Sequence, residues 1–429
     1  MNILNNRVLL ILTAGILCLA FAWQSSSSNQ KQQSSLLAER AAYNYVIGTQ
    51  TVGAKYQFTE ESMLVETAKV IRSMGSNLLK FSLNPRYCTE NYGLPRNENI
   101  RSLTDLATLE PSVKSVLDMD FTYYHIWAYG FSQYTQEPEG QKIDSSQVKF
   151  IGGLSDQHAE LLYKEMYDLA VHLLTTYSNT GKVFYLGHWE GDWHLRWHYD
   201  RTRPVDEATL RGMIRWEQIR QKAIDDAKAQ TPYEGVELYN YIEVNLVRMA
   251  MEEGMTVVTN AIIGEVNPDY VSYSSYDLTN PFRTESELRE GLHKGLDYIE
   301  SFLQPKEGLP PGKRVWIGEY GTPALAQGEA IQDRRSKWTI KAGLEWGAPF
   351  ILYWEMYNNE IKRETGEQVG YWMIDDQGEK QAIWHTHHQF FEEAGEFVDS
   401  YYLEHGVVPS LEKFQQAALQ FEALKCKAN

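Results

Sequence analysis

Short apolar runs of strand character alternate with longer amphipathic stretches from about Ala41 to the end of the chain. This alternation is typical of βα units built around a parallel sheet. A further run, Thr256–Ile263, has strand character but no clear place in the order. The eight runs that predict strands are Tyr43–Gln50, Asn77–Leu83, Phe121–Ala128, Val183–Glu190, Val236–Glu243, Tyr270–Tyr276, Val315–Glu319 and Phe350–Trp354.

The stretches between these runs carry helix signals. Thr284 and Glu287 form a capping box, and Leu288, Leu292, Leu296 and Ile299 then mark one helical face. Residues 155–178 and 205–230 also predict helices, and residues 410–425 predict an amphipathic helix on the outside of the domain. The sequence therefore predicts an α/β fold, a (β/α)8 TIM barrel with an extra C-terminal helix. Its long loops follow strands two (84–102), three (130–155) and four (191–203).

The N-terminus predicts export. Arg7, the apolar stretch Val8–Leu19 and the small-residue motif Ala20-Phe21-Ala22 are typical of a signal peptide spanning residues 1–22. Lipid attachment at Cys18 is an alternative, but Leu17 is large for the position before it. Residues 23–40 are rich in Ser and Gln and predict a flexible tether, so the folded domain spans 41–429. We expect a secreted or periplasmic protein without stable membrane insertion after cleavage.

The amino-acid composition argues against two classes of protein, nucleic-acid-binding proteins and disulfide-stabilised scaffolds. The chain has 57 acidic and 40 basic side chains and a net charge of −17, which disfavours a nucleic-acid partner. Three cysteines in 429 residues exclude a disulfide-stabilised scaffold. The sequence gives no sign of a cofactor, and we expect a monomer.

Two carboxylates follow apolar strands, where a charge needs a partner or a purpose. Strand periodicity predicts that Phe184 and Leu186 fill the barrel and that His188 and Glu190 emerge at its top. The same reasoning places Glu319 on one face with Val315 and Ile317. Functional groups of such barrels lie at the carboxyl ends of the strands, so Glu190 and Glu319 are candidate catalytic residues.

The segment Ile317-Gly318-Glu319-Tyr320-Gly321 resembles the seventh-strand nucleophile motif of clan A retaining glycoside hydrolases, such as the cellulase-like family 5 enzymes. Residues 186–190, at the end of strand four, lie where that clan carries its acid/base Glu. Residues 351–354 resemble its eighth strand, whose Trp floors the sugar subsite, and residues 270–276 resemble its sixth strand, which offers a Tyr. The resemblance implies a retaining glycosidase with Glu319 as nucleophile and Glu190 as acid/base.

One position departs from the clan. Asn usually precedes the acid/base Glu and binds the sugar 2-hydroxyl, but Trp189 stands there in this chain. A replacement donor such as Asn245, a shifted register of strand four, or a different acid would each account for it. Glu243 is the leading rival carboxylate.

The aromatic content favours a carbohydrate ligand, because the C–H faces of sugar rings stack on Trp and Tyr. Asn84 shares a face of strand two with Lys80 and Ser82, and these side chains either donate to sugar hydroxyls or hydrate the barrel mouth. The candidate substrate-binding residues are Trp354, Trp127, His125, Tyr276, Trp189, Asn245 and Asn84.

Two other functions stay open at this stage. His188, Glu190, Asp192 and His194 alternate along the chain, with His198 nearby, as in a metal-dependent hydrolase on the same barrel. A non-catalytic carbohydrate-binding barrel would keep the aromatic residues and need neither Glu. The sequence leaves the sugar, the linkage, endo or exo action, and transglycosylation undecided.

Overall fold

The computed structural model describes residues 39–40, 42–133, 150–197 and 199–426. The chain divides into two compact units, one of Asn44–Ala394 with Ser410–Asn429 and one of Met1–Tyr43 with Gly395–Pro409. The predicted signal peptide and most of the predicted tether lie outside the described residues. Across the described ranges, no helix is both long and apolar enough to cross a membrane.

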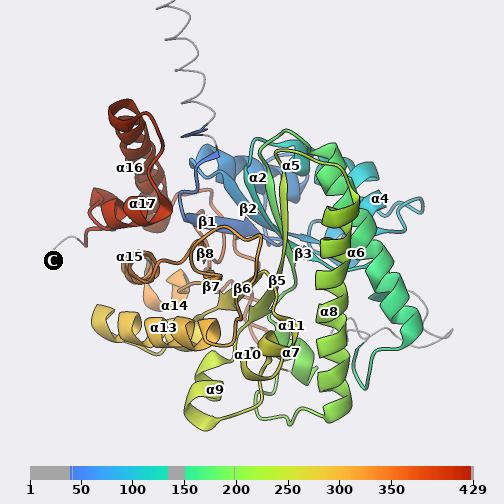
Figure 1. Cartoon of the computed structure of the whole chain (residues 1–429). Coiled ribbons are helices and arrows are strands. Elements are labelled where there is room, and N and C mark those ends of the chain that lie inside the picture. Colours follow the sequence, from blue (N-terminus) through green and yellow to red (C-terminus); the bar gives the residue numbers. More distant parts are fainter. Residues whose placement is uncertain (1–38, 41, 134–149, 198, 427–429) are drawn as a thin grey trace, which may run out of the picture. The chain divides into compact units, whose positions relative to one another are not determined.

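The larger unit is a closed barrel of parallel strands in sequential order, β1-β2-β3-β4-β5-β6-β7-β8. Helices surround it, and α6 (Asp156–Thr176) and α8 (Glu207–Gln230) lie side by side along its exterior (Figure 1). The predicted TIM barrel is therefore confirmed. Its strands are β1 (Ile47–Thr51), β2 (Leu78–Leu83), β3 (Tyr123–Ala128), β4 (Val183–Gly187), β5 (Glu237–Val244), β6 (Tyr270–Ser274), β7 (Val315–Tyr320) and β8 (Ile351–Tyr353).

The helices follow the predicted βα order. The capping box at Thr284 and Glu287 opens α13 as predicted. The run Thr256–Ile263 is not a strand: it contains the short helix α10 and the first residue of α11, and the Asn260 side chain accepts from the Val257 N–H at 2.9 Å at the start of α10. The helices are α2 (Met63–Ser73), α3 (Pro85–Glu90), α4 (Leu103–Leu109), α5 (Pro111–Asp118), α6 (Asp156–Thr176), α7 (Gly191–Arg196), α8 (Glu207–Gln230), α9 (Val247–Glu253), α10 (Val258–Ala261), α11 (Ile263–Val266), α12 (Tyr276–Thr279), α13 (Glu285–Glu300), α14 (Ala324–Gln327), α15 (Glu329–Trp346), α16 (Ala382–His405) and α17 (Leu411–Ala418), with 3-10 turns at Phe131–Gln133 and Glu422–Leu424.

Aromatic rings from several strands fill the barrel interior. His125 of β3 packs 4.7 Å from the ring of Tyr185 on β4, 4.8 Å from Trp316 on β7 and 4.5 Å from Phe350 next to β8. Tyr241 of β5 packs 5.1 Å from Trp316 in the same space. This packed floor closes the barrel below its carboxyl end, so a ligand can approach only from the top.

The predicted facing of β4 is wrong. Tyr185 and Gly187 point into the barrel, and a Cβ on Gly187 would lie 2.4 Å from the Tyr241 ring. Phe184 points outward and stacks 5.2 Å from Tyr124. Periodicity alone gives two alternating faces without saying which one is inside. The strand ends at Gly187, and non-strand backbone then brings Glu190 back over the barrel.

The predicted facing of β7 is also wrong, although it leads to the right position for Glu319. Trp316 and Gly318 point inward, while Ile317 packs outward against α15 near Gly343. A register shift opposite both neighbouring strands inserts one extra residue in β7 between Ile317 and Tyr320. This β-bulge reverses the alternation, so that Glu319 reaches the barrel mouth after an inward Gly318.

The C-terminal helix is shorter than predicted and ends at Ala418. Within the larger unit, Phe414 of α17 packs near Phe390, and the Gln415 amide donates to the Ala348 carbonyl at 2.9 Å. The smaller unit contains an ion pair between Arg40 and Asp399 at 2.6 Å and a hydrogen bond from the Tyr43 hydroxyl to the Pro409 carbonyl.

Candidate active site

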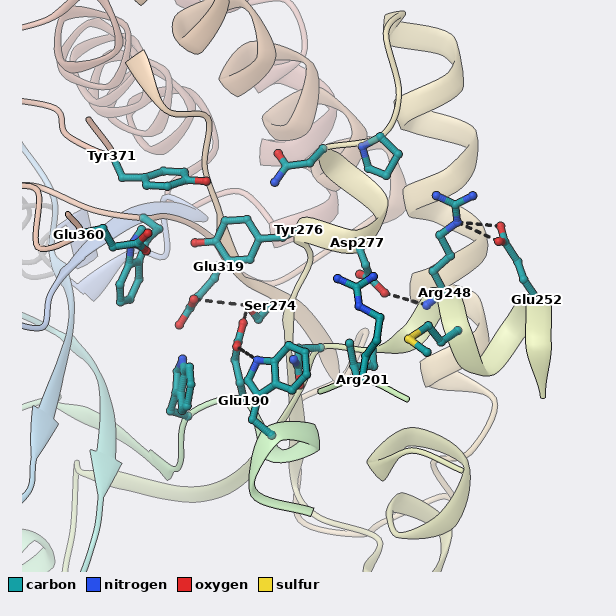
Figure 2. Close-up of a pocket in the computed structure, with 18 of the residues that line it drawn as sticks. Glu190, Arg201, Arg248, Glu252, Ser274, Tyr276, Asp277, Glu319, Glu360 and Tyr371 are labelled. Atoms are coloured by element: carbon teal, nitrogen blue, oxygen red, sulfur yellow. Dashed lines mark hydrogen bonds and ion pairs between the residues drawn. The ribbon is translucent and has the colours of Figure 1, made fainter. Parts of the chain in front are cut away.

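A cavity of about 710 Å³ opens at the carboxyl ends of β4 to β8. Glu190 and Glu319 meet near its centre, with Tyr276 and Tyr371 on one side and Arg201 and Arg248 on the other (Figure 2). Its lining consists of Trp189, Glu190, Trp193, Arg201, Asn245, Leu246, Arg248, Met249, Glu252, Glu253, Ser274, Tyr276, Asp277, Asn280, Pro281, Glu319, Trp354, Glu360 and Tyr371.

Glu190 is held from three directions. The Trp193 indole N–H donates to its Oε2 at 2.5 Å, and the Ser274 hydroxyl lies within hydrogen-bond distance of its Oε1. Its backbone N–H donates to Glu243 Oε1 at 3.1 Å, which fixes the chain after β4. These contacts aim the Glu190 side chain into the cavity (Figure 2).

Glu319 lies on the bulged strand beside a lysine. Lys80 Nζ of β2 lies 3.0 Å from Glu319 Oε1, and both side chains are almost fully buried. Glu319 Oε2 lies 3.3 Å from the Ser274 hydroxyl, so one oxygen meets the cation and the other faces Glu190.

The Ser274 hydroxyl joins the two carboxyl groups (Figure 2). Oxygens that share one hydroxyl lie within two hydrogen-bond lengths, roughly 6 Å. A hydroxyl has a single hydrogen, so it donates to one carboxylate and accepts from the other only if that group carries a proton. The arrangement therefore suits a pair of carboxyl groups that holds one proton.

The Glu190 and Glu319 carboxyl groups differ in the charges that surround them. Burial raises the pKa of Glu190 to about 8; the Glu243 charge adds to this, and the Ser274 and Trp193 hydrogen bonds oppose it. Burial raises the pKa of Glu319 well above its ordinary value, and the Lys80 ammonium in direct contact opposes the rise. Burial alone would lower the pKa of Lys80, and the Glu243 and Glu319 carboxylates raise it above its ordinary value. Lys80 contacts Glu319 directly and makes no ion pair with Glu190, so this contact favours a negative charge on Glu319 rather than on Glu190.

Four of the predicted substrate contacts line the cavity. Trp354 follows β8, Tyr276 begins α12, and Trp189 precedes Glu190. Asn245 follows β5, and its Oδ1 accepts from the Asp192 N–H at 3.2 Å. Trp127 lies just below the cavity, with its ring 6.2 Å from Trp354 and 4.6 Å from Lys80 Nζ.

The other two predicted contacts lie elsewhere. His125 is fully buried in the aromatic floor, where neither ring nitrogen has a hydrogen-bond partner and burial lowers its pKa well below the usual range. Asn84 caps α3, where its Oδ1 accepts from the N–H groups of Arg86 and Tyr87. His125 sits too early in its strand to reach the top, and helix capping turns the Asn84 oxygen away from the cavity.

The side chains of the histidine-rich segment 188–194 do not point toward one common metal site. His188 points outward and pairs with Glu217 of α8 at 2.7 Å, and His194 bonds the Tyr129 hydroxyl at 2.7 Å. Asp192 accepts the backbone N–H groups of Asn245, Leu246 and Val258. These partners lie in separate directions, and within the described ranges no cluster of three metal-ligating side chains occurs. His198 lies outside the described residues.

Several lining residues escaped sequence reasoning. Ser274 could have been found from the inward alternation of Tyr270, Ser272 and Ser274 along β6. Glu360 and Tyr371 come from the loop after β8, where no periodic pattern points to them. Buried Asn358 organises that loop by accepting from the N–H groups of Gly370 and Tyr371 and by donating to the Glu360 carbonyl.

Comparison with known proteins identifies the fold. No family model and no curated protein matches the chain. A variant of GH5_18 from Streptomyces cattleya, in a complex with Manb1-4GlcNAc, superposes with a TM-score of 0.55 at 10% identity, covering 81% of this chain and 80% of that one. GH5_18 from Bifidobacterium longum subsp. longum ATCC 55813 gives a TM-score of 0.53 at 12% identity, covering 86% and 81%. These neighbours are glycoside hydrolases, and the predicted resemblance to family 5-like barrels is confirmed at the level of the fold.

Proposed function

We propose that the protein is a glycoside hydrolase that cleaves O-glycosidic bonds of a poly- or oligosaccharide with retention of configuration. The observation that carries the proposal is the contact of Glu190 and Glu319 with one Ser274 hydroxyl inside an aromatic-lined cavity. Retaining enzymes need carboxyl groups about 5–5.5 Å apart, whereas inverting enzymes need about 6.5–9.5 Å. Sharing a hydroxyl supports the shorter separation.

Glu319 is the proposed nucleophile. Its carboxylate attacks the anomeric carbon and forms a glycosyl-enzyme ester, while the leaving oxygen departs. The Lys80 contact supports an ionised carboxylate at this position. The attack needs that charge, because a protonated carboxyl is a poor nucleophile.

Glu190 is the proposed acid/base. It donates its proton to the leaving oxygen, then takes a proton from the water that hydrolyses the ester. The pKa of about 8 supports a protonated group at neutral pH before the first step. Ester formation removes the negative charge of Glu319, which lowers the pKa of Glu190 and lets it act as a base in the second step.

Asn245 is the proposed replacement for the missing clan Asn. Because its Oδ1 accepts from the Asp192 N–H, its amide N–H groups are left to face the cavity that it lines. They would donate to a hydroxyl of the sugar at the cleaved bond. Trp354 and Tyr276 supply the stacking and hydroxyl contacts beside it.

We further propose that the protein acts as a monomer outside the cytoplasm after cleavage of residues 1–22, and that it needs no cofactor. The signal-like pattern of the N-terminus supports export. The divergent partners of His188, Asp192 and His194 weigh against the metal-dependent alternative.

The test is turnover of α- and β-linked polysaccharides, aryl glycosides and Man-β1,4-GlcNAc by wild type, Glu319→Gln and Glu190→Gln. Glu160→Gln, an exposed change on α6, serves as the control. We expect both active-site variants to lose at least 100-fold in kcat/KM and the control to match wild type. Proton NMR of the first-formed product should show the anomer of the substrate. Sugar binding by wild type without any turnover would instead favour a carbohydrate-binding barrel.

A further inference from the structure

Lys80 is buried with every donor used. Its ammonium contacts Glu243 Oε2 at 2.9 Å, Glu319 Oε1 at 3.0 Å and the Gly318 carbonyl at 3.1 Å. An ammonium group has three N–H donors, and three acceptors surround this one. A lysine that is 1% exposed needs such pairing to stay inside a protein. The three acceptors therefore fix the position of the charge.

Glu243 is buried below the cavity and does not line it. Its Oε2 accepts from Lys80 and, at 2.8 Å, from the Ser272 hydroxyl of β6. Its Oε1 accepts from the Glu190 N–H at 3.1 Å. One carboxylate thus contacts both the cation that faces Glu319 and the backbone that carries Glu190.

We propose that Glu243, together with Lys80, is a positioning residue that sets the division of protons between the two catalytic carboxyl groups. Glu243 holds the ammonium against Glu319 and holds the Glu190 backbone in place. Its own negative charge keeps the proton on Glu190, because ionisation there would place a third carboxylate beside a single ammonium. The role of the pair in catalysis rests on the proposed function. It also leaves the acid/base role to Glu190 rather than Glu243, because Glu243 has no contact with substrate.

Other titratable groups face this network. His125 lies below Lys80, Tyr241 faces Glu243, Tyr276 faces Glu319, and Tyr199 faces Glu190. Glu355 and Glu360 approach from the loop after β8. Burial keeps His125 neutral and raises the pKa of each of these tyrosines. The change Glu243→Gln alters none of these residues; it removes one negative charge and one of the two acceptor oxygens of Glu243.

The experiment measures the ionisation of Glu190 without substrate. Trp193 donates its indole N–H to Glu190, so the chemical shift of that proton follows the charge on the carboxyl group. Protein labelled with ¹⁵N at its 12 tryptophans is titrated between about pH 5 and 10, and the variant Trp193→Phe assigns the resonance. The pH profile of kcat/KM is recorded on the same samples.

We expect Glu243→Gln to move the midpoint of the Trp193 titration to lower pH by about 1 pH unit or more. The basic limb of the kcat/KM profile should move to lower pH by the same amount. Ser272→Ala removes a neutral donor from the same Glu243 oxygen and should leave the midpoint unchanged. If Glu243→Gln does not fold, Lys80→Gln carries the test, because loss of the ammonium should raise the midpoint instead.

An unchanged midpoint in Glu243→Gln would overturn the proposal and leave Glu243 a purely structural group. Loss of activity that azide restores with an activated leaving group would also overturn it, because this marks Glu243 as the acid/base itself. Failure of the proposed function is a different result. Wild type would then turn over no glycoside, while the Trp193 midpoint would still move in Glu243→Gln.

Discussion

Lys80→Met is the perturbation that most directly tests the electrostatics of the barrel mouth. It keeps an apolar chain of similar length beneath Trp127 but removes the ammonium that contacts both Glu243 and Glu319. Breaking a buried ion pair by removing one partner costs about 3–5 kcal/mol, because a charge is left without compensation.

The protein can limit that cost by taking up a proton. A carboxyl group with an unfolded-state pKa of about 4.3 is neutralised at pH 7 for about 3.7 kcal/mol, at 1.36 kcal/mol for each pH unit. The destabilisation should therefore be about 3–4 kcal/mol at pH 7 and only about 1 kcal/mol at pH 5.

The direction in which stability changes with pH follows from the linkage between folding and proton binding. In the variant, a carboxyl group has a folded-state pKa raised above its unfolded value, so the folded state holds a proton that the unfolded state releases. Relative to wild type, stability is then lost as the pH rises above about 4.3. The expected slope is about 1.4 kcal/mol per pH unit, which corresponds to one proton.

Urea denaturation followed by tryptophan fluorescence at pH 5, 6, 7 and 8 measures this difference. Lys182→Met is a matched control, because Lys182 is also buried but donates to the carbonyls of Met119 and Phe121 and to the Tyr124 hydroxyl. The loss of unfolding free energy caused by Lys182→Met should be the same at pH 5 and pH 7. If Lys80→Met lowers the free energy of unfolding by less than about 1 kcal/mol at pH 7, or by an amount that does not grow with pH, the reasoning is refuted.

Three further changes test single contacts. Trp193→Phe removes a donor that favours ionised Glu190, so the pKa of Glu190 should rise above about 8 and the basic limb of kcat/KM should move to higher pH; a limb that stays in place contradicts this. Asn245→Ala should lower kcat/KM by about 10- to 100-fold on a sugar with a 2-hydroxyl and much less on the 2-deoxy analogue, since one hydrogen bond in the transition state is worth about 1.5–3 kcal/mol. An equal loss on both substrates would assign Asn245 to structure alone. His125→Phe should change the free energy of unfolding by less than about 1.5 kcal/mol and leave kcat/KM unchanged, because two unpaired buried nitrogens are replaced by an apolar ring. A large loss of turnover would return His125 to the sugar site.

The local patterns of the sequence determined the elements. Apolar runs and helix signals predicted all eight strands in order, and the capping box predicted the start of α13 to the residue. The place of Glu190 and Glu319 at the barrel mouth was predicted because each carboxylate follows an apolar run, and such a position depends only on neighbours in the chain. The misassigned run Thr256–Ile263 shows the limit of this reasoning, since residues of strand character form the short helix α10 there instead.

The facing of the strands and the partners of the charges were decided by tertiary structure. Period-two alternation is symmetric, so only packing against β3, β5 and the helices determined that Tyr185, not Phe184, fills the barrel. The bulge that turns Glu319 inward exists only relative to β6 and β8. Lys80 lies 163 residues from Glu243 and 239 from Glu319, and their contact depends on closure of the barrel. Closure brings distant side chains within hydrogen-bond range, and no pattern along the chain encodes such a distance.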